Sequence, residues 1–454
     1  MSEYLHKSVL VLGLGKSGES AARLLLQIGA QVTVADSSDT PTLRERAEAL
    51  TQIGARVCLG SAALTDSSKY DLAILSPGID PAVPLVQRVI SQGIPMIGEL
   101  ELAFQHCQCP VVAITGTNGK TTTTELTTWM FTHCGLKAES VGNIGLPFTA
   151  IAMESAQLDV VVVEVSSFQL ETIQTFRPRI AAWLNFSANH LDRYPGLQEY
   201  YDAKLRIFEN QTEADFAVVN ARSELPKLKA QRVSFSAFDS SADFHLRGGE
   251  LYFRGTPVLN QTHTQLSGVH NAENLMSALA IGHAFGLEFP AMAQAVTDYR
   301  APEHRCEFAR ELDGVIYIND SKSTNLDSLE KAILAQDRRI ILIAGGKDKG
   351  FEFGALAPLV AERVKHAVLI GEMRERIRRD WPGVSIELAV SLPEAVGLAQ
   401  QAAAAGEVVL FSPGTSSFDM FSSYIERGQK FKAAVQQLTP QTTNPTTTSE
   451  RNQL

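Results

Sequence analysis

The sequence is poor in cysteine and has no long apolar segment, and both absences exclude classes of protein. It has 5 cysteines in 454 residues, an odd and scattered set that does not suit a disulfide-stabilised secreted domain. Cys107 and Cys109 lack the second ligand pair of a zinc site, so we expect reduced thiols without a special role. No stretch reaches the roughly 18 to 20 apolar residues of a membrane helix, and the N-terminus has no signal-peptide cleavage pattern. We therefore expect a cytoplasmic protein without membrane insertion.

The sequence also has fewer basic than acidic residues. Lys and Arg number 40 against 50 Asp and Glu, which gives a formal net charge of -10. An acidic chain without a basic tract is a poor general nucleic-acid binder, so we expect no nucleic-acid partner. The apolar fraction of 44% and the charged fraction of 20% are those of a folded globular protein, and the length predicts roughly three domains.

Short apolar strands alternate with helical stretches in three successive segments, which indicates an α/β fold built on parallel, doubly wound sheets. We expect domains at residues 1–100, 101–302 and 303–440, and a disordered tail at 441–454, where periodicity is lost. Strands are expected at 8–12, 31–35, 71–75, 110–114, 159–164, 183–186, 315–318, 339–343 and 408–411.

A glycine turn, GLGKSG at 13–18, follows the first strand, and Asp36 stands at the end of the next one. Glycines let the backbone approach a pyrophosphate, and the helix that follows presents N–H groups and the positive end of its dipole. The same pattern fits NAD, another diphosphate nucleotide, or simply close packing of a helix on a strand. The motif by itself leaves these three interpretations open.

A second turn, TGTNGKTT at 115–122, lies between an apolar strand and a helix. It predicts a phosphate loop, in which Lys120 reaches the β- and γ-phosphates and the Thr121 hydroxyl faces Mg²⁺. The loop departs from the usual spacing, because Ile114 stands where the first glycine is expected. The central segment is thus expected to be a P-loop ATPase-type α/β domain between two Rossmann-like α/β domains. The expected ATP contacts in the loop are Gly116, Thr117, Asn118, Gly119, Lys120, Thr121 and Thr122.

Two further residues follow strands of the central segment and are candidates for the same site. Glu164 ends an apolar strand, so its carboxylate is expected at the sheet edge beside the phosphate loop, where open α/β sheets bind ligands. His190 comes just after the strand expected at 183–186. It could ligate metal, contact phosphate or be structural, and the residues alone do not decide.

Seven motifs now stand in one order along the chain. They are TGTNGKTT (115–122), EVSSFQL (164–170), NHLD (189–192), YDAKLRIF (201–208), GVHNAEN (268–274), HRCE (304–307) and NDSKSTN (319–325). With these motifs the chain resembles, over essentially its whole length, the Mur ligases, the ATP-dependent enzymes that add amino acids to the peptidoglycan precursor.

Within that family, three features favour the member that adds D-glutamate to UDP-N-acetylmuramoyl-L-alanine. They are the short first domain with GLGKSG, the loop GGKDKG at 345–350, and LFSPGTSSFDMF at 410–421. The alternative is a Mur ligase that adds a different amino acid. The resemblance implies a reaction through an acyl phosphate that releases ADP and phosphate. It also implies that the first glycine turn holds the UDP part of the substrate, through Gly15, Lys16, Ser17, Asp36 and Gly78.

The resemblance also implies catalytic and metal-binding roles for Lys120, Glu164, His190 and Lys204. Thr121 and Glu164 would hold one Mg²⁺, and Glu164, His190 and Lys204 a second. A protonated lysine repels Mg²⁺, so Lys204 would act as a carbamate formed with CO₂, which turns a cation into an oxygen ligand. From the residues alone, Lys204 would equally be a solvated lysine on a helix.

The remaining roles follow from the motifs of the family. For ATP, the expected contacts outside the loop are Asn271 and Asn274 to adenine, Arg305 to the phosphates, Asp320 to the ribose and Lys322 near the γ-phosphate. For the other substrates, they are Asn143 to the muramoyl part and Thr324, Lys349, Ser417 and Tyr424 to D-glutamate. Ser417 is expected near a helix start, with Tyr424 about one turn beyond it.

Three segments that contribute to one site imply movement, so we expect the third domain to close over ATP about a hinge at 300–304. Arg305 and Lys322 would then reach ATP only in the closed form. Separately, we expect a monomer. Two other classes stay open at this point. A nicotinamide-dependent oxidoreductase leaves the phosphate loop without a purpose, and a non-catalytic nucleotide-binding scaffold would bind ATP without turnover.

Overall fold

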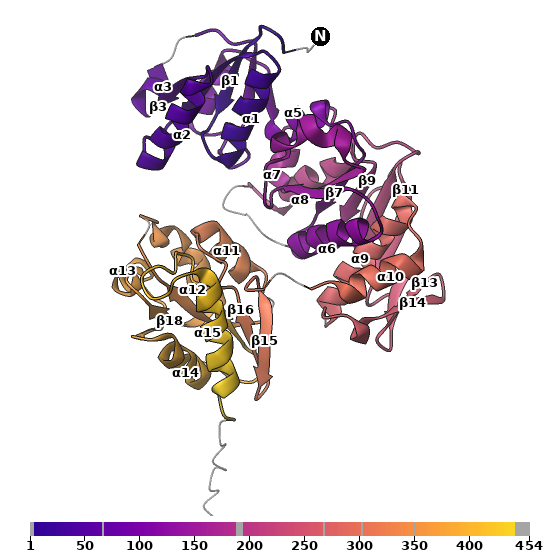
Figure 1. Cartoon of the computed structure of the whole chain (residues 1–454), viewed down its shortest axis with the longest axis vertical. Helices are drawn as coiled ribbons and strands as arrows, with labels where there is room; N and C mark the ends of the chain where they lie inside the picture. The colour runs from indigo at the N-terminus through magenta and orange to yellow at the C-terminus, as the bar shows by residue number, and fades with distance from the viewer. Residues whose placement is uncertain are drawn as a thin grey trace, which may run out of the picture. The chain divides into compact units, whose positions relative to one another are not determined.

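The computed structural model describes residues 4–65, 68–187, 194–266, 268–300, 303–336, 338–348 and 350–440. The chain divides into two compact units, Met1–Arg300 and Ala301–Leu454, and each is described by itself (Figure 1). The tail predicted at 441–454 and part of the hinge predicted at 300–304 lie outside the described residues. The domain boundaries near residues 100 and 302 stay a prediction.

The first sheet of unit 1 is entirely parallel. Its strands are β1 (Ser8–Leu12), β2 (Gln31–Asp36), β3 (Arg56–Leu59), β4 (Leu72–Leu75) and β5 (Met96–Gly98). They lie in the order β3-β2-β1-β4-β5, the order of a doubly wound nucleotide-binding fold. The chain reverses direction across the sheet between β1 and β4, so ligand-binding turns are expected at the carboxyl ends of these two strands.

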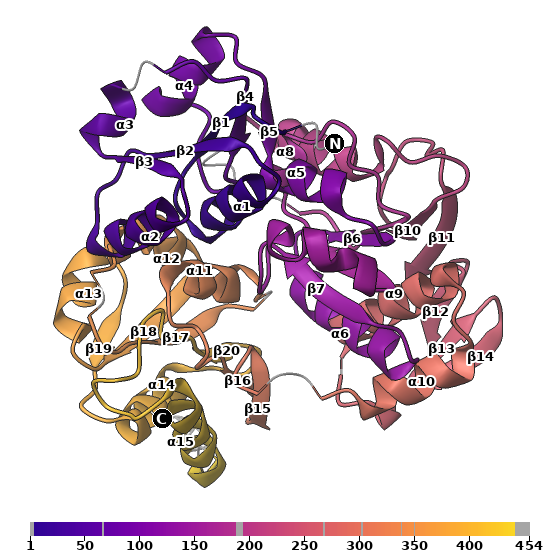
Figure 2. The ribbon, with the colours of Figure 1, turned by 45° about the horizontal axis from the view of Figure 1, so that its top comes forward.

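Helices cover both faces of this sheet. They are α1 (Lys16–Gln27), α2 (Pro41–Gln52), α3 (Ser61–Thr65), α4 (Pro84–Ser91) and α5 (Glu99–His106). Figure 2 shows α1 and α2 on one face and α3 and α4 on the other. The alternation of side chains along β1 explains this: Val9 and Val11 pack in a cluster with α1, and Leu10 and Leu12 in a cluster with α3 and α4.

The second sheet of unit 1 is larger and mostly parallel. Its strands are β6 (Val111–Thr115), β7 (Ala138–Gly142), β8 (Val160–Glu164), β9 (Ile180–Trp183), β10 (Phe216–Asn220), β11 (Gln231–Ser236), β12 (Phe244–Arg247), β13 (Glu250–Phe253) and β14 (Thr256–Asn260). They lie in the order β14-β13-β12-β11-β10-β9-β6-β8-β7, and the pairs from β7 to β12 are parallel. The last two pairs are antiparallel hairpins. The chain reverses direction about β6, which makes the carboxyl end of β6 a second expected ligand site.

One apolar cluster explains why residues 1–300 form a single unit. It joins Val9 and Val11 of the first sheet to Val111 and Ala113 of the second through residues of α1 and α5. The opposite face of the second sheet packs on α6, α9 and α10. The helical segments of this part are α6 (Lys120–His133), η1 (Phe148–Ala150), η2 (Ala152–Gln157), α7 (Ser167–Leu170), α8 (Leu197–Leu205), η3 (Arg206–Phe208), η4 (Gln261–His263), α9 (Val269–Phe285) and α10 (Phe289–Asp298).

Unit 2 is a third α/β layer structure. Its strands are β15 (Glu307–Leu312), β16 (Val315–Asn319), β17 (Ile340–Gly345), β18 (Val364–Ile370), β19 (Ile386–Leu388) and β20 (Val408–Phe411). They lie in the order β15-β16-β20-β17-β18-β19, with only β15 antiparallel to its neighbour. Its helices are α11 (Leu326–Leu334), η5 (Phe353–Leu356), α12 (Ala357–Arg363), α13 (Arg374–Asp380), α14 (Leu392–Ala402) and α15 (Tyr424–Gln437). The α/β fold class with three sheets is confirmed.

Two local expectations are wrong. The strand expected at 183–186 lies earlier, as β9 (Ile180–Trp183), because the chain turns after Trp183 to bring Asn185 onto the phosphate loop. Ser417 does not stand near a helix start: α15 begins at Tyr424 with Ser423 as its N-cap, and Ser417 precedes it in a separate turn.

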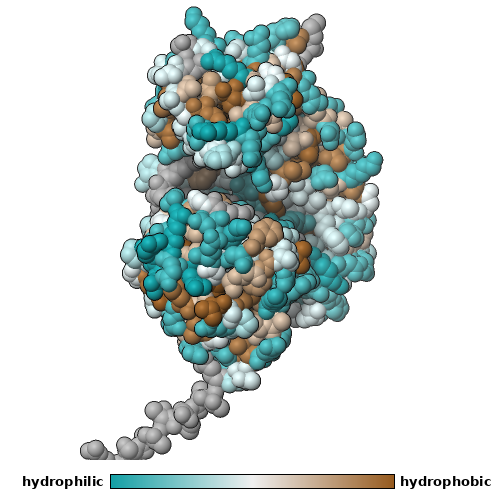
Figure 3. All heavy atoms as spheres, turned by 60° about the vertical axis from the view of Figure 1, so that its left-hand side comes forward, coloured by the Kyte–Doolittle hydropathy of each residue, from teal (hydrophilic) through white to brown (hydrophobic). Residues whose placement is uncertain are grey.

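The surface and the thiols complete the description. Figure 3 shows hydrophilic side chains over much of the face that it draws, with apolar side chains in small groups among them. Within the described parts of the chain, none of the helices combines the length and apolarity needed to span a bilayer. All five cysteines are free thiols.

Candidate functional site

The first glycine turn has the geometry that its spacing predicts. Gly13 has a φ of +92°, which favours glycine. A Cβ on Gly18 would lie 1.9 Å from the Gly13 carbonyl oxygen, so only glycine allows α1 to pack this closely on β1. A Cβ on Gly15 would meet nothing within 4 Å, which leaves its backbone open to an approaching ligand.

Asp36 shapes this turn through both of its carboxylate oxygens. One accepts from the Leu14 backbone N–H at 2.9 Å and the other from the Ser38 N–H at 2.9 Å. Arg46 donates to the Leu14 carbonyl at 3.0 Å, so Leu14 is held from both sides. The carboxylate thus has a structural task that the sequence pattern did not indicate. Its predicted contact with the UDP part of a substrate stays a prediction.

The turn after β4 lies beside the first glycine turn, because β4 pairs directly with β1. A Cβ on Gly13 would lie 2.6 Å from Ile79 Cδ1 and 3.2 Å from Ser76 Oγ. The structure therefore brings Gly78, which lies between these two residues, to the same sheet edge as Gly15, Lys16 and Ser17. A Cβ on Gly78 would meet nothing within 4 Å.

The phosphate loop is held in shape by a residue that the sequence analysis missed. The Asn185 side-chain oxygen accepts from the backbone N–H groups of Thr117 at 3.0 Å and Asn118 at 2.8 Å. Its amide nitrogen donates to the Asn118 carbonyl at 3.0 Å. Asn185 stands two residues after β9, the neighbour of β6. A polar residue just beyond that strand was the available signal, but the strand was expected to extend past it.

Two glycines fix how the loop joins α6. Gly119 has a φ of +81° and precedes Lys120, the first residue of the helix. A Cβ on Gly119 would lie 2.4 Å from Asn274 Oδ1, and one on Gly116 would lie 2.9 Å from Leu184 Cβ. Close approach favours glycine at both positions, and at Gly119 the left-handed backbone conformation favours it as well.

Two lysines converge on the carbonyl groups of the loop. Lys120 donates to the Gly116 and Thr117 carbonyls at 2.9 Å each. Lys204, from α8, donates to the same Gly116 carbonyl at 3.0 Å and contacts Thr115 Oγ1 at 3.3 Å. Lys204 is only 2% exposed. Burial, reinforced by the positive charge of Lys120 and opposed by Glu164, holds the pKa of Lys204 well below its ordinary value.

Glu164 lies where three strand ends meet. The register pairs it with Ile114 of β6 on one side and Gly142 of β7 on the other. Its carboxylate, 2% exposed as a residue, accepts from Thr121 Oγ1 at 2.8 Å and from Asn143 Nδ2 at 2.8 Å. One carboxylate thus joins the first helical turn after the phosphate loop to the turn after β7.

This cluster fits a hard divalent cation in its chemistry. Hydroxyl and carboxylate oxygens are the donors that Mg²⁺ prefers, and Thr121 and Glu164 supply one of each at hydrogen-bonding distance. Lys204 in its amine form is not an Mg²⁺ ligand. His190 lies outside the described residues, so its predicted place in the cluster stays a prediction.

The asparagines of α9 reach the same helix from the other side. Asn274 accepts from Thr123 Oγ1 of α6 at 3.2 Å and donates to the Asn271 side chain at 3.3 Å. Asn274 is buried, with 9% exposure. The pair is therefore placed against the start of α6, beside the phosphate loop. Their predicted contact with adenine stays a prediction.

Unit 2 gathers its own set of predicted residues at the ends of β16 and β20, which are parallel neighbours. Asp320 is 5% exposed and accepts from the Cys306 backbone N–H at 3.1 Å and from Ser412 Oγ at 2.7 Å. Burial raises the pKa of Asp320 to about 6, against the lowering influence of these two donors and of Arg305. The Lys322 side chain is exposed, and its backbone N–H donates to the His304 carbonyl at 2.9 Å.

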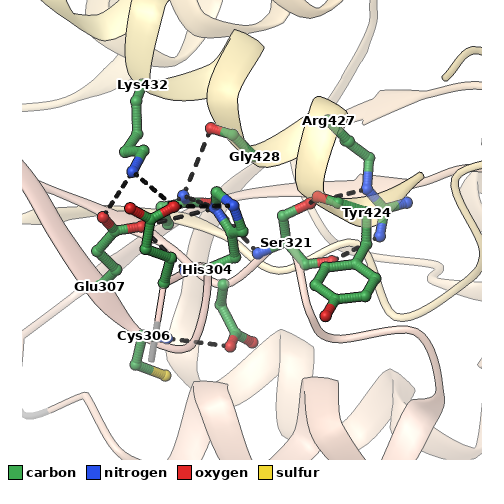
Figure 4. Close-up of polar contacts among 11 residues, drawn as sticks. His304, Cys306, Glu307, Ser321, Tyr424, Arg427, Gly428 and Lys432 are labelled. Carbon is green, nitrogen blue, oxygen red and sulfur yellow. Dashed lines mark hydrogen bonds and ion pairs between the residues drawn. The ribbon is translucent and has the colours of Figure 1, made fainter. Parts of the chain in front are cut away.

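A buried network lies behind these residues (Figure 4). His304, which has a φ of +66°, is 1% exposed, and burial lowers the pKa of its imidazole. Its Nδ1 lies 2.9 Å from the Asn319 amide nitrogen. Glu307 accepts from Asn319 and from the His304 backbone N–H at 2.9 Å each, and from Lys432 at 2.8 Å. The HRCE motif is thereby anchored to β16 and α15.

The described residues predicted for D-glutamate follow β16 and β20, which are neighbouring strands of unit 2. Ser417 is 2% exposed. The adjacent Ser416 carbonyl accepts from the Lys347 backbone N–H at 2.9 Å, which joins the turn after β17 to the turn after β20. Thr324 is half-buried beyond β16, and Tyr424 begins α15. Lys349 lies outside the described residues.

Comparison with known proteins found family models and relatives that are similar to this chain over most of its length. Three family models match in succession: the MurD-like N-terminal domain of Mur ligases at 7–98, the Mur ligase middle domain at 114–282, and the glutamate ligase domain of Mur ligases at 304–414. The UDP-N-acetylmuramoylalanine–D-glutamate ligase of Geobacter metallireducens is 44% identical over 95% of this chain and 98% of its own length. That of Trichlorobacter lovleyi is 44% identical over 95% and 99%.

Solved structures show the same fold at much lower identity. A murein peptide ligase from Psychrobacter arcticus superposes with a TM-score of 0.52 at 16% identity, covering 95% of this chain and 99% of that one. At this identity the likeness speaks for the arrangement of strands and helices alone.

Proposed function

We infer, from the premise that this chain belongs to the Mur ligase family, that it joins D-glutamate to UDP-N-acetylmuramoyl-L-alanine at the expense of ATP. The substrates are those of curated relatives that are 43 to 44% identical over 95% of the chain. The names of these relatives do not favour the alternative within the family, a ligase for a different amino acid. A nicotinamide-dependent oxidoreductase is disfavoured, because the family accounts for both glycine turns without it.

The chemistry requires activation of a carboxylate, which is a poor electrophile. An oxygen of the L-alanyl carboxylate attacks the γ-phosphorus of ATP, the bond to the β-γ bridging oxygen breaks, and an acyl phosphate and ADP result. The D-glutamate amine then attacks the carbonyl carbon and loses a proton, and the bond to the phosphate oxygen breaks. The protein supplies position and charge stabilisation rather than a covalent intermediate.

One observation carries the proposal: the Glu164 carboxylate accepts from both Thr121 and Asn143. Thr121 belongs to the loop proposed to hold the ATP phosphates, and Asn143 to the turn proposed to hold the muramoyl part. Because both residues donate to one carboxylate, the γ-phosphate and the acceptor carboxylate would meet beside it. This is the juxtaposition that acyl phosphate formation requires.

Lys120 and bound Mg²⁺ would share the neutralisation of phosphate charge. Lys120 already points across the mouth of the loop, at the Gly116 and Thr117 carbonyls. Thr121 and Glu164 would hold one Mg²⁺, and Glu164, His190 and a carbamylated Lys204 a second. When bound, Mg²⁺ withdraws charge from the transferring phosphoryl group.

We propose that Lys204 is carbamylated because it is buried. A lysine with a lowered pKa has more neutral amine at neutral pH than an ordinary lysine. The neutral amine adds to CO₂ and releases one proton, which leaves an N-linked carboxylate in place of a cation. Growth in ¹³C-labelled bicarbonate should give a carbamate resonance that is absent in Lys204→Met, and its absence in the active enzyme would rule the carbamate out.

Unit 2 would supply residues to the ATP site and to the D-glutamate site. Arg305, Asp320 and Lys322 would contact the phosphates and ribose of ATP, and Asn271 and Asn274 the adenine from unit 1. Thr324, Lys349, Ser417 and Tyr424 would hold D-glutamate, and Gly15, Lys16, Ser17, Asp36 and Gly78 the UDP part. We further propose a cytoplasmic monomer, in which unit 2 closes about residues 300–304.

The deciding experiment measures ADP release with each candidate amino acid, with and without UDP-N-acetylmuramoyl-L-alanine. Release should require both the UDP substrate and D-glutamate. Turnover with another amino acid would favour the alternative ligase, and binding of ATP without turnover would favour a scaffold. Enhancement of NADH fluorescence on mixing would instead favour the oxidoreductase.

A further inference from the structure

Two cysteines outside the proposed active site face each other. Cys107 is the C-cap of α5, and Cys109 follows two residues later, just before β6. Their sulfur atoms lie 3.7 Å apart, and both residues are half-buried. The remaining cysteines have no thiol neighbour among the described contacts, and Cys58 is buried. The sequence pattern led us to expect reduced thiols without a special role, because these two cysteines cannot complete a zinc site.

The surroundings hold the pair in this arrangement. The Gln108 backbone N–H, between the two cysteines, donates to Ser155 Oγ at 2.9 Å, and Ser155 is fully buried in η2. Cys107 Sγ also lies 3.5 Å from the Cys109 carbonyl oxygen. Hydrogen bonding from Cys109 lowers the pKa of Cys107 to about 6 and so favours its thiolate, while the pKa of Cys109 is raised.

We propose that Cys107 and Cys109 are a reversible redox pair that peroxide converts to a disulfide. The Cys107 thiolate attacks hydrogen peroxide, takes one oxygen as a sulfenic acid and releases hydroxide, which a proton from solvent converts to water. The Cys109 thiol then displaces the sulfenic oxygen as a second water, and the S–S bond forms. A thiol reductant restores both thiols.

The geometry makes this ring closure a local event. The sulfurs must approach by about 1.7 Å, from 3.7 Å to the roughly 2.0 Å of a disulfide. Only Gln108 lies between the two cysteines, so rotation of two side chains and a small adjustment of one loop suffice. Neither thiol touches the residues proposed for catalysis.

The test uses the reduced full-length chain, treated with hydrogen peroxide, blocked with N-ethylmaleimide, digested and analysed by mass spectrometry. The peptide that contains both cysteines should lose two hydrogens and take up no maleimide, and dithiothreitol should restore both adducts. In Cys109→Ser, Cys107 should stop at a sulfenic acid that dimedone traps. Cys134→Ser, which removes a lone half-buried thiol, should form the pair normally. The proposal is overturned if both thiols still take up maleimide at a peroxide dose that oxidises Cys134.

A second observation, independent of the first, concerns a buried arginine in unit 2. Arg427 is 1% exposed, and its three hydrogen bonds go to uncharged groups. Figure 4 shows Arg427 beside Ser321. Arg427 donates to Ser321 Oγ at 3.0 Å, to the Ser321 carbonyl at 2.8 Å and to the Thr415 carbonyl at 3.0 Å. Burial lowers the pKa of Arg427 to about 10.

Burying a charged arginine costs folding free energy, so we expect Arg427 to have a specific role. Its two partners belong to the turns that follow β16 and β20. The first turn holds Asp320 and Lys322, proposed for ATP, and the second leads into Ser417, proposed for D-glutamate. The guanidinium thus joins the turn proposed for the nucleotide to the turn proposed for the amino acid.

We infer that Arg427 is a positioning residue for these two turns, an inference that rests on the proposed function. Lys cannot reproduce the fork of the guanidinium, so Arg427→Lys and Arg427→Met should each raise KM for D-glutamate and for ATP roughly tenfold, through the loss of one or two hydrogen bonds. KM for the UDP substrate should stay unchanged, because its proposed contacts lie in unit 1. Lys430→Met, an exposed change on the same helix, is the matched control.

The outcomes separate the two claims. If wild type shows no turnover with D-glutamate, the proposed function fails whatever Arg427 does. If wild type is active and both variants lower the melting temperature without changing KM for D-glutamate or ATP, the positioning role is refuted.

Discussion

Asp320 allows a prediction whose size and sign both follow from the structure. The side chain is buried, and its oxygens accept from the Cys306 backbone N–H and from Ser412 Oγ. Burial raises the pKa of Asp320 from 3.8 to about 6. At about 1.4 kcal/mol per pKa unit, keeping this carboxylate ionised costs about 3 kcal/mol of folding stability above pH 6.

The sign follows from proton uptake. Between about pH 4 and pH 6 the folded form holds a proton on Asp320 that the unfolded form has released. This group's contribution therefore becomes less favourable as the pH rises through that window, and the full penalty is present at pH 7 and above.

Asp320→Asn removes the charge and keeps the shape. An asparagine oxygen can still accept from the Cys306 N–H, and its amide can donate to Ser412 Oγ after the hydroxyl turns. Unit 2 of the variant should be more stable than wild type by up to about 3 kcal/mol at pH 8, and the difference should shrink towards pH 5. This figure already includes the attraction to Arg305, which lowers the pKa of Asp320 and so offsets part of the cost of burial.

The assay is amide hydrogen exchange in β16 and β20 of the full-length chain in moderate urea, at pH 5, 6, 7 and 8. Wild type and variant are compared at each pH, so intrinsic exchange rates cancel. Asp298→Asn, an exposed carboxylate at the end of α10, is the control and should show no such trend. A stability difference that is the same at pH 5 and pH 8, or a variant less stable than wild type at pH 8, would refute the reasoning.

Three further predictions concern unit 1. Lys204→Met should abolish ligation yet raise thermal stability by about 1 kcal/mol or more, because it replaces a buried ionisable side chain, amine or carbamate, by an apolar chain of similar length; unchanged activity or a lower melting temperature contradicts this. Asn185→Ala should raise KM for ATP roughly tenfold or more, because two loop N–H groups lose their acceptor; an unchanged KM in nucleotide titrations would dismiss the role. Gly142→Ala should lower the melting temperature far more than Gly135→Ala, since both have positive φ but only the Cβ at 142 would meet the Glu164 carbonyl, at 2.4 Å; equal losses would mean that contact is unimportant.

Much of the fold could be predicted because buried parallel strands have a recognisable apolar pattern in the sequence. A strand covered by helices on both faces is a continuous apolar run, as in β1, β16 and β20, whose predicted and observed bounds agree to within one residue. The wrong bounds expected for β9 also come from an apolar run. Leu184 and Phe186 are apolar and extend the run, but the chain has already left the sheet to place Asn185 on the phosphate loop.

The candidate site was predictable only where one motif carries its own geometry. The phosphate loop is local, so its spacing sufficed to expect Gly119 before a helix that starts at Lys120. Asn185 and Arg427 act across 67 and 106 residues of sequence on Asn118 and Ser321. No local pattern encodes such contacts, because they depend on which strands become neighbours. The ligand of the first glycine turn could not be predicted for a different reason: the backbone geometry of this turn suits several diphosphate ligands equally well.

Strand register explains contacts that the sequence motifs do not predict. Glu164 is opposite Ile114 on one side and Gly142 on the other because β8 lies between β6 and β7. That placement lets Asn143, the residue after β7, and Thr121, in the first turn of α6 after β6, donate to one buried carboxylate. A ligase that must bring a phosphoryl donor and a carboxylate acceptor together therefore needs no dedicated linking element. The order of three strands brings the two turns together, and a change that moved β7 by one residue would disconnect Asn143 from Glu164 while leaving the phosphate loop intact.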